Sequence, residues 1–293
     1  MNLNNSLKNL RFGADRLAQH SAESKNKALI CVAQALKSHQ EDILKANEID
    51  VAQARSRGTK ESLVDRLLLN EKRIDAIIDS IHIIINQTDP IGMVDNGWTS
   101  PEGLQIKQIR VPLGVACIIY ESRPNVTVDA FAIAYKSGNA ILLRGSSSAL
   151  KSNIEIVNAI KDGLTKAGED GVKEAIELAA SGERSEVEEI LNAVGKIDVV
   201  LPRGGADLIN MVVEKARIPV IETGSGICHL FIDESADLEN AVDITLNAKL
   251  QRPGVCNAIE VLLVHENIQD AFLPMLAAAI KGRAQLRCCE KSY

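Results

Sequence analysis

Between residues 115 and 216 the chain alternates short apolar runs with longer amphipathic segments. The runs VACIIY, NAILLRG, EAIELAA and DVVLP each have the length of a buried strand, and segments of helical length separate them. Consecutive parallel strands need a crossover of a dozen or more residues, usually a helix. The alternation therefore predicts an α/β fold with a parallel sheet and right-handed crossovers.

A second, shorter set of the same kind follows residue 221. It comprises a strand at 228–233, a helix at 238–250 and a strand at 259–265. With 293 residues and typical domains of about 100–200 residues, two domains are expected. We place them at 1–221, with N-terminal helices and a nucleotide-binding sheet, and at 222–293.

The region before residue 115 predicts helices and then a hairpin. Helical periodicity covers residues 2–55 and 60–86, with an interruption at SRGTKES. Residues 95–111 contain turn residues followed by alternating apolar positions, which predicts a β-hairpin that projects from the body.

Composition excludes several classes of partner. Aromatic residues make up 3%, too few for a platform that stacks single-stranded nucleic acid. The net charge is −6, so no basic surface for nucleic acid is expected. No apolar run reaches the roughly 18–20 residues of a membrane span, and the N-terminus lacks the apolar core of a signal peptide. A cytoplasmic protein is expected.

The six cysteines are scattered and lack CxxC spacing, so neither a disulfide framework nor a metal site is expected. Cys256 is unusual because it follows Pro253 and Gly254 in LQRPGVCNAIE, at a turn before a predicted strand. Such a turn can hold a side chain at the rim of a cleft. From these residues alone a buried, inert thiol remains the favoured interpretation, since such cysteines outnumber nucleophiles.

Two predicted strand-to-helix turns are candidates for binding phosphate, although GxGxxG and GxxxxGK[ST] are both missing. LLRGSSSA and LPRGGADL each place an arginine and small residues before a helix, where free N–H groups can meet an anion. Their occurrence in one sheet favours a ligand that carries phosphate. The candidate residues are Arg144, Gly145, Ser146, Ser147, Arg203, Gly204 and Gly205.

Several longer stretches carry a resemblance. YESRPNV, PRGG, ETGSG and NAKLQRPGVCNA, with the segments around them, are similar to the γ-glutamyl phosphate reductase family, a branch of the aldehyde dehydrogenase superfamily. The resemblance covers essentially the whole chain. It implies an aldehyde-dehydrogenase-like fold with a parallel-sheet nucleotide-binding domain and an α/β catalytic domain.

The resemblance implies the reaction. Cys256 would be the nucleophile that attacks L-glutamate 5-phosphate, and NADPH would reduce the resulting thioester to L-glutamate 5-semialdehyde, a step of proline biosynthesis. Candidate oxyanion donors are the Cys256 N–H and the amide of Asn125 or Asn257. We favour Asn125, with Ser122 as a rival. Asn125 could instead cap a helix that begins near Thr127.

Other residues receive roles by the same resemblance. Glu222 matches the superfamily glutamate that activates water in hydrolytic members, and here it would tune Cys256 or donate a proton. Arg123, Arg252 and Asn257 are expected to bind the phosphate and carboxylate of the substrate.

The cofactor is expected to be NADP. NAD-preferring members often carry a carboxylate three positions after the basic residue of the first turn, whereas this chain has Ser147 there. Arg144 would pair with the 2′-phosphate.

The resemblance also implies a homo-oligomer in which the hairpin reaches a partner, and a functional link with glutamate 5-kinase. Members of the family continue well past the position at which this chain ends, so we expect a C-terminally truncated catalytic domain. Two alternatives stay open: a non-catalytic fragment that binds nucleotide, and a related CoA-acylating or semialdehyde dehydrogenase.

Overall fold

The structure is a computed structural model that describes residues 3–180, 183–222, 224 and 226–290. It divides into two compact units, Met1–Thr223 and Gly224–Tyr293; the sequence predicts the division between residues 221 and 222.

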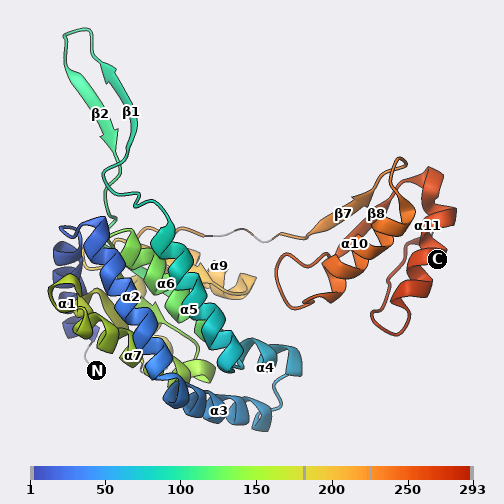
Figure 1. The fold of residues 1–293 in the computed structure, drawn as a ribbon, viewed down its shortest axis with the longest axis horizontal. Coiled ribbons are helices and arrows are strands. Elements are labelled where there is room, and N and C mark those ends of the chain that lie inside the picture. The colour runs from blue at the N-terminus through green and yellow to red at the C-terminus, as the bar shows by residue number, and fades with distance from the viewer. Residues whose placement is uncertain (1–2, 181–182, 223, 225, 291–293) are drawn as a thin grey trace. The chain divides into compact units, whose positions relative to one another are not determined.

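The elements of the first unit (Figure 1) are α1 (Leu3–Leu17), α2 (Ala22–Ser38), α3 (Gln40–Ser56), α4 (Glu61–Leu67), α5 (Glu71–Asn86), β1 (Val94–Thr99), β2 (Gln105–Ile109), β3 (Val115–Tyr120), α6 (Pro124–Lys136), β4 (Ala140–Arg144), η1 (Ser147–Ala149), α7 (Leu150–Lys166), η2 (Gly168–Asp170), η3 (Lys173–Ala175), β5 (Ile176–Leu178), α8 (Arg184–Leu191), β6 (Val199–Arg203) and α9 (Ala206–Lys215).

The main sheet has four parallel strands in the order β5-β4-β3-β6. Cys117 on β3 lies opposite Leu142 on β4 and Val200 on β6. Val220 forms a further parallel bridge with Val200, so the segment after α9 returns along the outer side of β6. The predicted parallel α/β sheet is therefore confirmed, and each crossover between its strands contains a helix.

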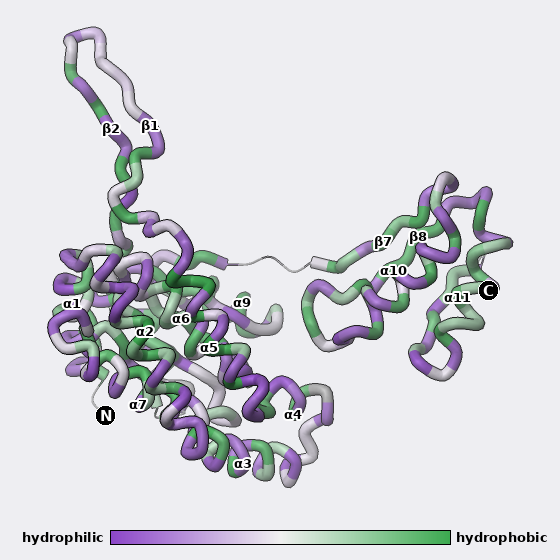
Figure 2. Tube along the Cα trace, viewed as in Figure 1, coloured by the Kyte–Doolittle hydropathy of each residue, from purple (hydrophilic) through white to green (hydrophobic). Residues whose placement is uncertain are grey.

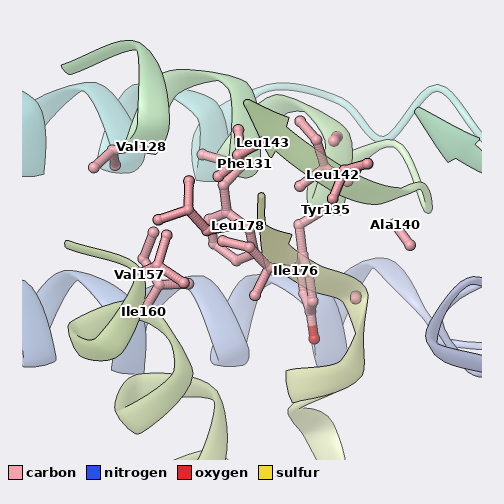
Figure 3. Close-up of a cluster of buried hydrophobic side chains, with 14 of the residues drawn as sticks. Val128, Phe131, Tyr135, Ala140, Leu142, Leu143, Val157, Ile160, Ile176 and Leu178 are labelled. Atoms are coloured by element: carbon pink, nitrogen blue, oxygen red, sulfur yellow. The ribbon is translucent and has the colours of Figure 1, made fainter. Parts of the chain in front are cut away.

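The core lies where helices pack on this sheet. Val128, Phe131 and Tyr135 recur at helical spacing on α6, are fully buried, and bring the Phe131 and Tyr135 ring centroids to 5.3 Å. They meet side chains of β4, β5 and α7 (Figure 3), including Leu142 and Ile160. Full burial of one such side chain stabilises the fold by about 1.5–3 kcal/mol.

The two helical stretches predicted before residue 87 are five helices in the structure. Two of the additional breaks follow from capping residues inside the predicted stretches. The Ser21 hydroxyl accepts the N–H of Ser24 at 3.1 Å and starts α2, and Asn70 Oδ1 accepts the N–H of Arg73 at 2.8 Å and starts α5. Periodicity alone misses these boundaries because the apolar spacing continues across them.

Strands β1 and β2 form an antiparallel hairpin that extends away from the rest of the first unit (Figure 1). Every residue of both strands is exposed, and Trp98 and Ile106 are 51% and 37% exposed. An ion pair of 2.8 Å between Arg110 and Asp95 links the two sides near the base.

The second unit contains β7 (His229–Ile232), α10 (Leu238–Leu250), β8 (Val261–Val264), η4 (Glu266–Ile268) and α11 (Gln269–Ile280). The two strands are parallel, and β8 is apolar along its whole length (Figure 2). Ile232 packs with Phe272 and Leu276 of α11, whereas Phe231 and Leu263 are 55% and 48% exposed. One face of the pair is thus covered by helices of the same unit. Within the described ranges, no helix combines the length and apolar character that a membrane span requires.

The crossing of α2 and α7 yields a prediction. A Cβ added at Gly163 of α7 would lie 2.5 Å from Val32 Cα of α2. Gly163→Ala should therefore lower the free energy of unfolding by about 1–3 kcal/mol, because neither backbone can move without disturbing the core. Urea denaturation followed by circular dichroism measures this loss.

The control is Asn158→Ala, which alters an exposed position of the same helix. It should leave stability unchanged or slightly raised, since alanine has the higher helix propensity. A Gly163→Ala protein as stable as the parent would show that the two helices are not in this close contact.

Candidate functional site

The candidate nucleotide-binding edge of the main sheet lies at the carboxyl ends of β3, β4 and β6. Because β4 and β6 flank β3, and the chain crosses from one side of β3 to the other between β5 and β6, the strand order reverses beside β3. Ligands of open α/β sheets bind outside such a reversal. The segments that leave the strands here begin at Glu121, Gly145 and Gly204.

The turn between β6 and α9 holds a carboxylate of the protein itself. Glu121 Oε1 accepts the N–H of Gly205 at 2.9 Å, and Glu121 N–H donates to the Arg203 carbonyl at 3.3 Å. A Cβ at Gly204 would lie 2.7 Å from the same carboxylate oxygen, so the close approach needs glycine. Glu121 thus occupies the helix N-terminus for which the sequence predicts phosphate, and a ligand anion there would have to displace it.

The turn between β4 and α7 is lined by hydroxyl groups. Ser148 Oγ is hydrogen-bonded to Ser122 Oγ at 2.6 Å and to Ser146 Oγ at 2.9 Å, which connects the ends of β3 and β4. Ser147 is exposed and Gly145 is buried. Ser147–Ala149 form a short 3₁₀ turn, and the helix expected after LLRGSSSA, α7, begins at Leu150.

The first turn of α7 is also partly filled from within. Asp50 of α3 is 2% exposed, and its Oδ2 accepts both the N–H and the hydroxyl of Ser152, at 2.8 and 2.7 Å. Ser146 Oγ accepts the Ser148 N–H at 3.3 Å. The N–H groups of Ser148 and Ser152 therefore already have side-chain acceptors within the protein, so a ligand anion would compete with Ser146 and Asp50 for them.

Arg144 is the cation of this turn. Its two terminal nitrogens donate to the carbonyls of Gly145 at 3.1 Å and Glu183 at 3.3 Å. Its Nε is buried and has no hydrogen-bond partner among the described residues. Arg144 is half-buried, whereas Arg203 on the other turn is exposed. Because the protein encloses Nε, a ligand acceptor would meet the terminal nitrogens of Arg144, in competition with the Gly145 and Glu183 carbonyls.

Asn125 is not a helix cap. Helix α6 begins at Pro124 with Arg123 as its N-cap residue, so Asn125 lies inside the first turn. The alternative of a cap for a helix near Thr127 is wrong, because proline suits the first helical position and starts the helix earlier. Asn125 Nδ2 donates to Asp129 at 3.0 Å, and Arg123 is half-buried.

Glu222 follows the segment that pairs with β6, where the Ile221 N–H donates to the Val200 carbonyl at 3.0 Å. Its side chain is exposed. Because Val220 is opposite Val200 in a parallel bridge, Glu222 lies two residues further along, toward the carboxyl end of β6.

Cys256 lies in the second unit, on the turn between α10 and β8. Cys256 is exposed, so the buried thiol favoured by the residues alone is wrong, and Arg252 and Asn257 on the same turn are exposed as well. The Val255 N–H donates to the Arg252 carbonyl at 3.3 Å, and Cys228 Sγ donates to the Cys256 carbonyl at 3.2 Å. By contrast, burial raises the pKa of the Cys117 thiol and keeps it protonated.

Sequence reasoning missed Glu121, Ser148, Asp50 and Cys228. Each acts through a partner far along the chain, such as Gly205 for Glu121 and Ser152 for Asp50. The signals for Glu121 were its place directly after a buried strand and within YESRPNV, beside Arg123 and Asn125.

A model described as the aldehyde dehydrogenase family matches residues 5–286. The chain belongs to the aldehyde dehydrogenase family. The expected aldehyde-dehydrogenase-like fold is thereby confirmed.

Curated relatives indicate which branch of the family this chain is similar to. A protein of Alkaliphilus oremlandii named gamma-glutamyl phosphate reductase is 52% identical over 287 residues, which are 97% of this chain and 68% of that protein. A protein of the same name from Thermobifida fusca is 51% identical over 92% of this chain and 64% of its own length. The predicted resemblance to this branch is confirmed, and the chain spans about two thirds of the length of these relatives.

Solved structures agree with this placement. The crystal structure of gamma-glutamyl phosphate reductase from Thermotoga maritima has a TM-score of 0.89 and 47% identity, covering 100% of this chain and 70% of that one. Betaine aldehyde dehydrogenase from Staphylococcus aureus, solved in complex with NAD+, has a TM-score of 0.68 and 21% identity over 94% of this chain and 53% of its own. The similarity to betaine aldehyde dehydrogenase shows a shared fold only.

The residues of the β4 turn fit the phosphate-bearing end of a nicotinamide dinucleotide, the hydride carrier expected for this family. Arg144 brings a half-buried cation, and Ser147 brings an exposed hydroxyl whose neighbours in sequence are serines. The β6 turn differs, because its carboxylate, Glu121, is exposed, whereas Asp50 beside α7 is buried.

Glu121 provides the prediction for this site. Glu121→Ala removes the acceptor of the Gly205 N–H and the negative charge at the start of α9. The free energy of unfolding should fall by about 0.5–2 kcal/mol, measured by urea denaturation with circular dichroism. Glu121→Gln should lose less, since its amide oxygen can still accept.

Glu214→Ala, near the opposite end of α9, is the matched control. Removing a negative charge from a helix C-terminus should not destabilise it. If Glu121→Ala is as stable as Glu214→Ala, Glu121 does not cap α9 in solution.

Proposed function

We propose that this chain reduces L-glutamate 5-phosphate to L-glutamate 5-semialdehyde and phosphate with NADPH, as a step of proline biosynthesis. The observation that carries the proposal is Cys256, an exposed thiol on a turn of a chain that is 52% identical to a gamma-glutamyl phosphate reductase. That relative's name supplies the substrate, and the turn supplies the nucleophile.

Sulfur suits this reaction. The Cys256 thiolate attacks the γ-carbonyl carbon, the C–O bond to phosphate breaks, and a thioester remains on the protein. Bound NADPH supplies the hydride that reduces this thioester. The C–S bond of the resulting thiohemiacetal then breaks, which releases the aldehyde and regenerates the thiol. A serine would form an ester, which is a poorer hydride acceptor.

The oxyanion formed in both halves of the reaction needs donors aimed at it. We assign the Cys256 N–H as one donor and the Asn125 amide as another. In the structure Asn125 donates to Asp129 and Ser122 is hydrogen-bonded to Ser148. To bind the oxyanion, either side chain would have to give up its present partner. Comparing the turnover of Asn125→Ala with that of Ser122→Ala identifies which side chain is the donor.

The substrate carries an acyl phosphate and an α-carboxylate, and guanidinium groups recognise both. We assign Arg252 and Asn257 to the phosphate, because they share the exposed turn of Cys256. Arg123, the N-cap residue of α6, is assigned to the carboxylate. Glu222 is proposed to tune Cys256 or to donate a proton, because activating water would destroy the thioester.

NADP is the proposed cofactor. Arg144 would hold the 2′-phosphate, and Gly145, Ser146 and Ser147 would form the turn around it. Arg203, Gly204 and Gly205 remain proposed contacts to the dinucleotide, on a turn they share with the Glu121 carboxylate. Because that carboxylate repels phosphate, we assign the main phosphate contact to Arg144.

The exposed β1–β2 hairpin is the proposed contact between copies of the chain. Its apolar side chains, Trp98 and Ile106 among them, are exposed on two strands that pair only with each other among the described residues. Such edges invite pairing with another chain. The functional link with glutamate 5-kinase, whose product is the substrate proposed here, completes the proposal.

Cys256→Ser should reduce turnover by on the order of a thousandfold or more, because the nucleophile is lost. Turnover is followed as NADP reduction in the presence of L-glutamate 5-semialdehyde and phosphate, and circular dichroism checks the fold. Cys288→Ser, which removes another exposed thiol, is the control and should retain activity. Comparable rates for the two variants would refute the assignment of the nucleophile, and CoA-dependent but phosphate-independent turnover would refute the substrate.

Arg144→Ala should weaken NADPH binding about tenfold to a hundredfold more than NADH binding, because a charge-assisted contact is worth about 1.5–3 kcal/mol. Ser147→Glu should shift the preference further by adding repulsion. Arg203→Ala, which removes the exposed arginine of the other turn, should affect both cofactors alike. Fluorescence titrations with each cofactor make the comparison, and equal losses in Arg144→Ala would mean that this arginine is structural.

A further inference from the structure

A second thiol lies against the turn that carries Cys256. Cys228 Sγ donates a hydrogen bond to the Cys256 carbonyl oxygen, and the two atoms are 3.2 Å apart. Both residues belong to the second unit, so the contact is made within one compact body. The Cys228 thiol therefore contacts the backbone of Cys256 itself.

The fold of this unit enforces the approach. Cys228 directly precedes β7, and its carbonyl accepts the N–H groups of Glu260 and Val261, at 3.0 and 3.2 Å. The parallel pairing of β7 with β8 thus fixes where β8 begins. Because Cys256 lies just before that start, the strand pairing holds its turn beside Cys228.

Exposure differs among the thiols in a way that sets the order of reaction. Cys256 is exposed, Cys228 is half-buried, and Cys117 is buried inside the sheet of the first unit. Oxidation of cysteine follows access and thiolate character. A small oxidant in solution therefore reaches Cys256 before Cys228.

A disulfide between Cys228 and Cys256 requires the turn to bring the two sulfur atoms together. Residues 251–258 contain no helix or strand, and the turn is closed by hydrogen bonds of 3.3 Å from Val255 N–H to the Arg252 carbonyl and from Ala258 N–H to the Val255 carbonyl. At present the carbonyl oxygen of Cys256 lies beside the Cys228 thiol. For the two sulfur atoms to meet, the backbone of this turn must rotate so that the Cys256 side chain takes the place of that carbonyl. A disulfide needs Cβ atoms about 3.5–4.5 Å apart, so this rotation has to bring the Cβ atoms of Cys228 and Cys256 to that separation.

We propose that Cys228 and Cys256 form a site of reversible oxidative modification, in which Cys228 resolves an oxidised Cys256. The oxidant is hydrogen peroxide. The Cys256 thiolate attacks one peroxide oxygen, the O–O bond breaks, and a sulfenic acid and, after proton uptake, water are formed. The Cys228 thiolate then attacks the Cys256 sulfur, the S–O bond breaks, and a second water leaves.

In total, two thiols and one peroxide give one disulfide and two waters. The two sulfur atoms lose two electrons and the peroxide oxygens gain them. Exchange with a dithiol restores both thiols. The disulfide blocks Cys256 but protects it from the irreversible sulfinic acid. This chemistry depends on the cysteine pair alone and holds whatever substrate the chain acts on.

The test treats the native full chain with a small excess of hydrogen peroxide and follows intact mass and peptide maps under non-reducing conditions. We expect loss of two hydrogen atoms, a cross-link between the peptides of Cys228 and Cys256, and full reversal by dithiothreitol. Cys228→Ser should instead accumulate sulfinic acid at Cys256, and dithiothreitol should no longer restore its alkylation by iodoacetamide.

The control is the double variant Cys288→Ser, Cys289→Ser, which removes the remaining exposed thiols and should form the same cross-link as the parent. Oxidation of Cys256 in the parent without a link to Cys228 would overturn the proposal. A link to Cys288 or Cys289, or one only between separate chains, would overturn it as well. Because the readout is mass, the result stands apart from whether the proposed reduction occurs.

Discussion

The pairing of β3 with both β4 and β6 is the constraint on which the candidate nucleotide-binding edge of the sheet depends. Cys117 in the middle of β3 is opposite Leu142 and Val200, and these apolar strands are covered by helices. Since all these strands run parallel, their carboxyl ends meet at one edge. Because of this register, Glu121 accepts a hydrogen bond from Gly205 there, and Ser122 is hydrogen-bonded to Ser148.

Charge at that edge separates two turns that look alike in sequence. Both turns start a helix, carry an arginine and receive a carboxylate, but Glu121 on the β6 turn is exposed, whereas Asp50 at the first turn of α7 is buried. A helix N-terminus attracts negative charge, and here the chain supplies it. A ligand phosphate is therefore favoured where a cation and hydroxyl groups remain available, at Arg144 and Ser147.

The sequence was sufficient where local pattern determines structure. Buried runs such as VACIIY predicted strands, and helical spacing predicted α10 at its observed bounds. The apolar pattern did not predict helix boundaries that a single residue sets. Ser21 and Asn70 start helices as caps, and Pro124 starts α6 before its apolar periodicity begins. The contacts of Glu121 and Cys228 could not be predicted, because they depend on strand order and turn packing that no local pattern records.

A covalent intermediate on Cys256 is the consequence of these assignments that can be observed most directly. The chain is mixed with L-glutamate 5-semialdehyde and NADP without phosphate, quenched in acid, and analysed by peptide mass spectrometry. A glutamyl thioester on the peptide of Cys256, formed together with about one equivalent of NADPH per subunit and discharged when phosphate is added, is the expected result. An unmodified Cys256 after NADPH has formed, or an acyl group on another residue, would contradict it.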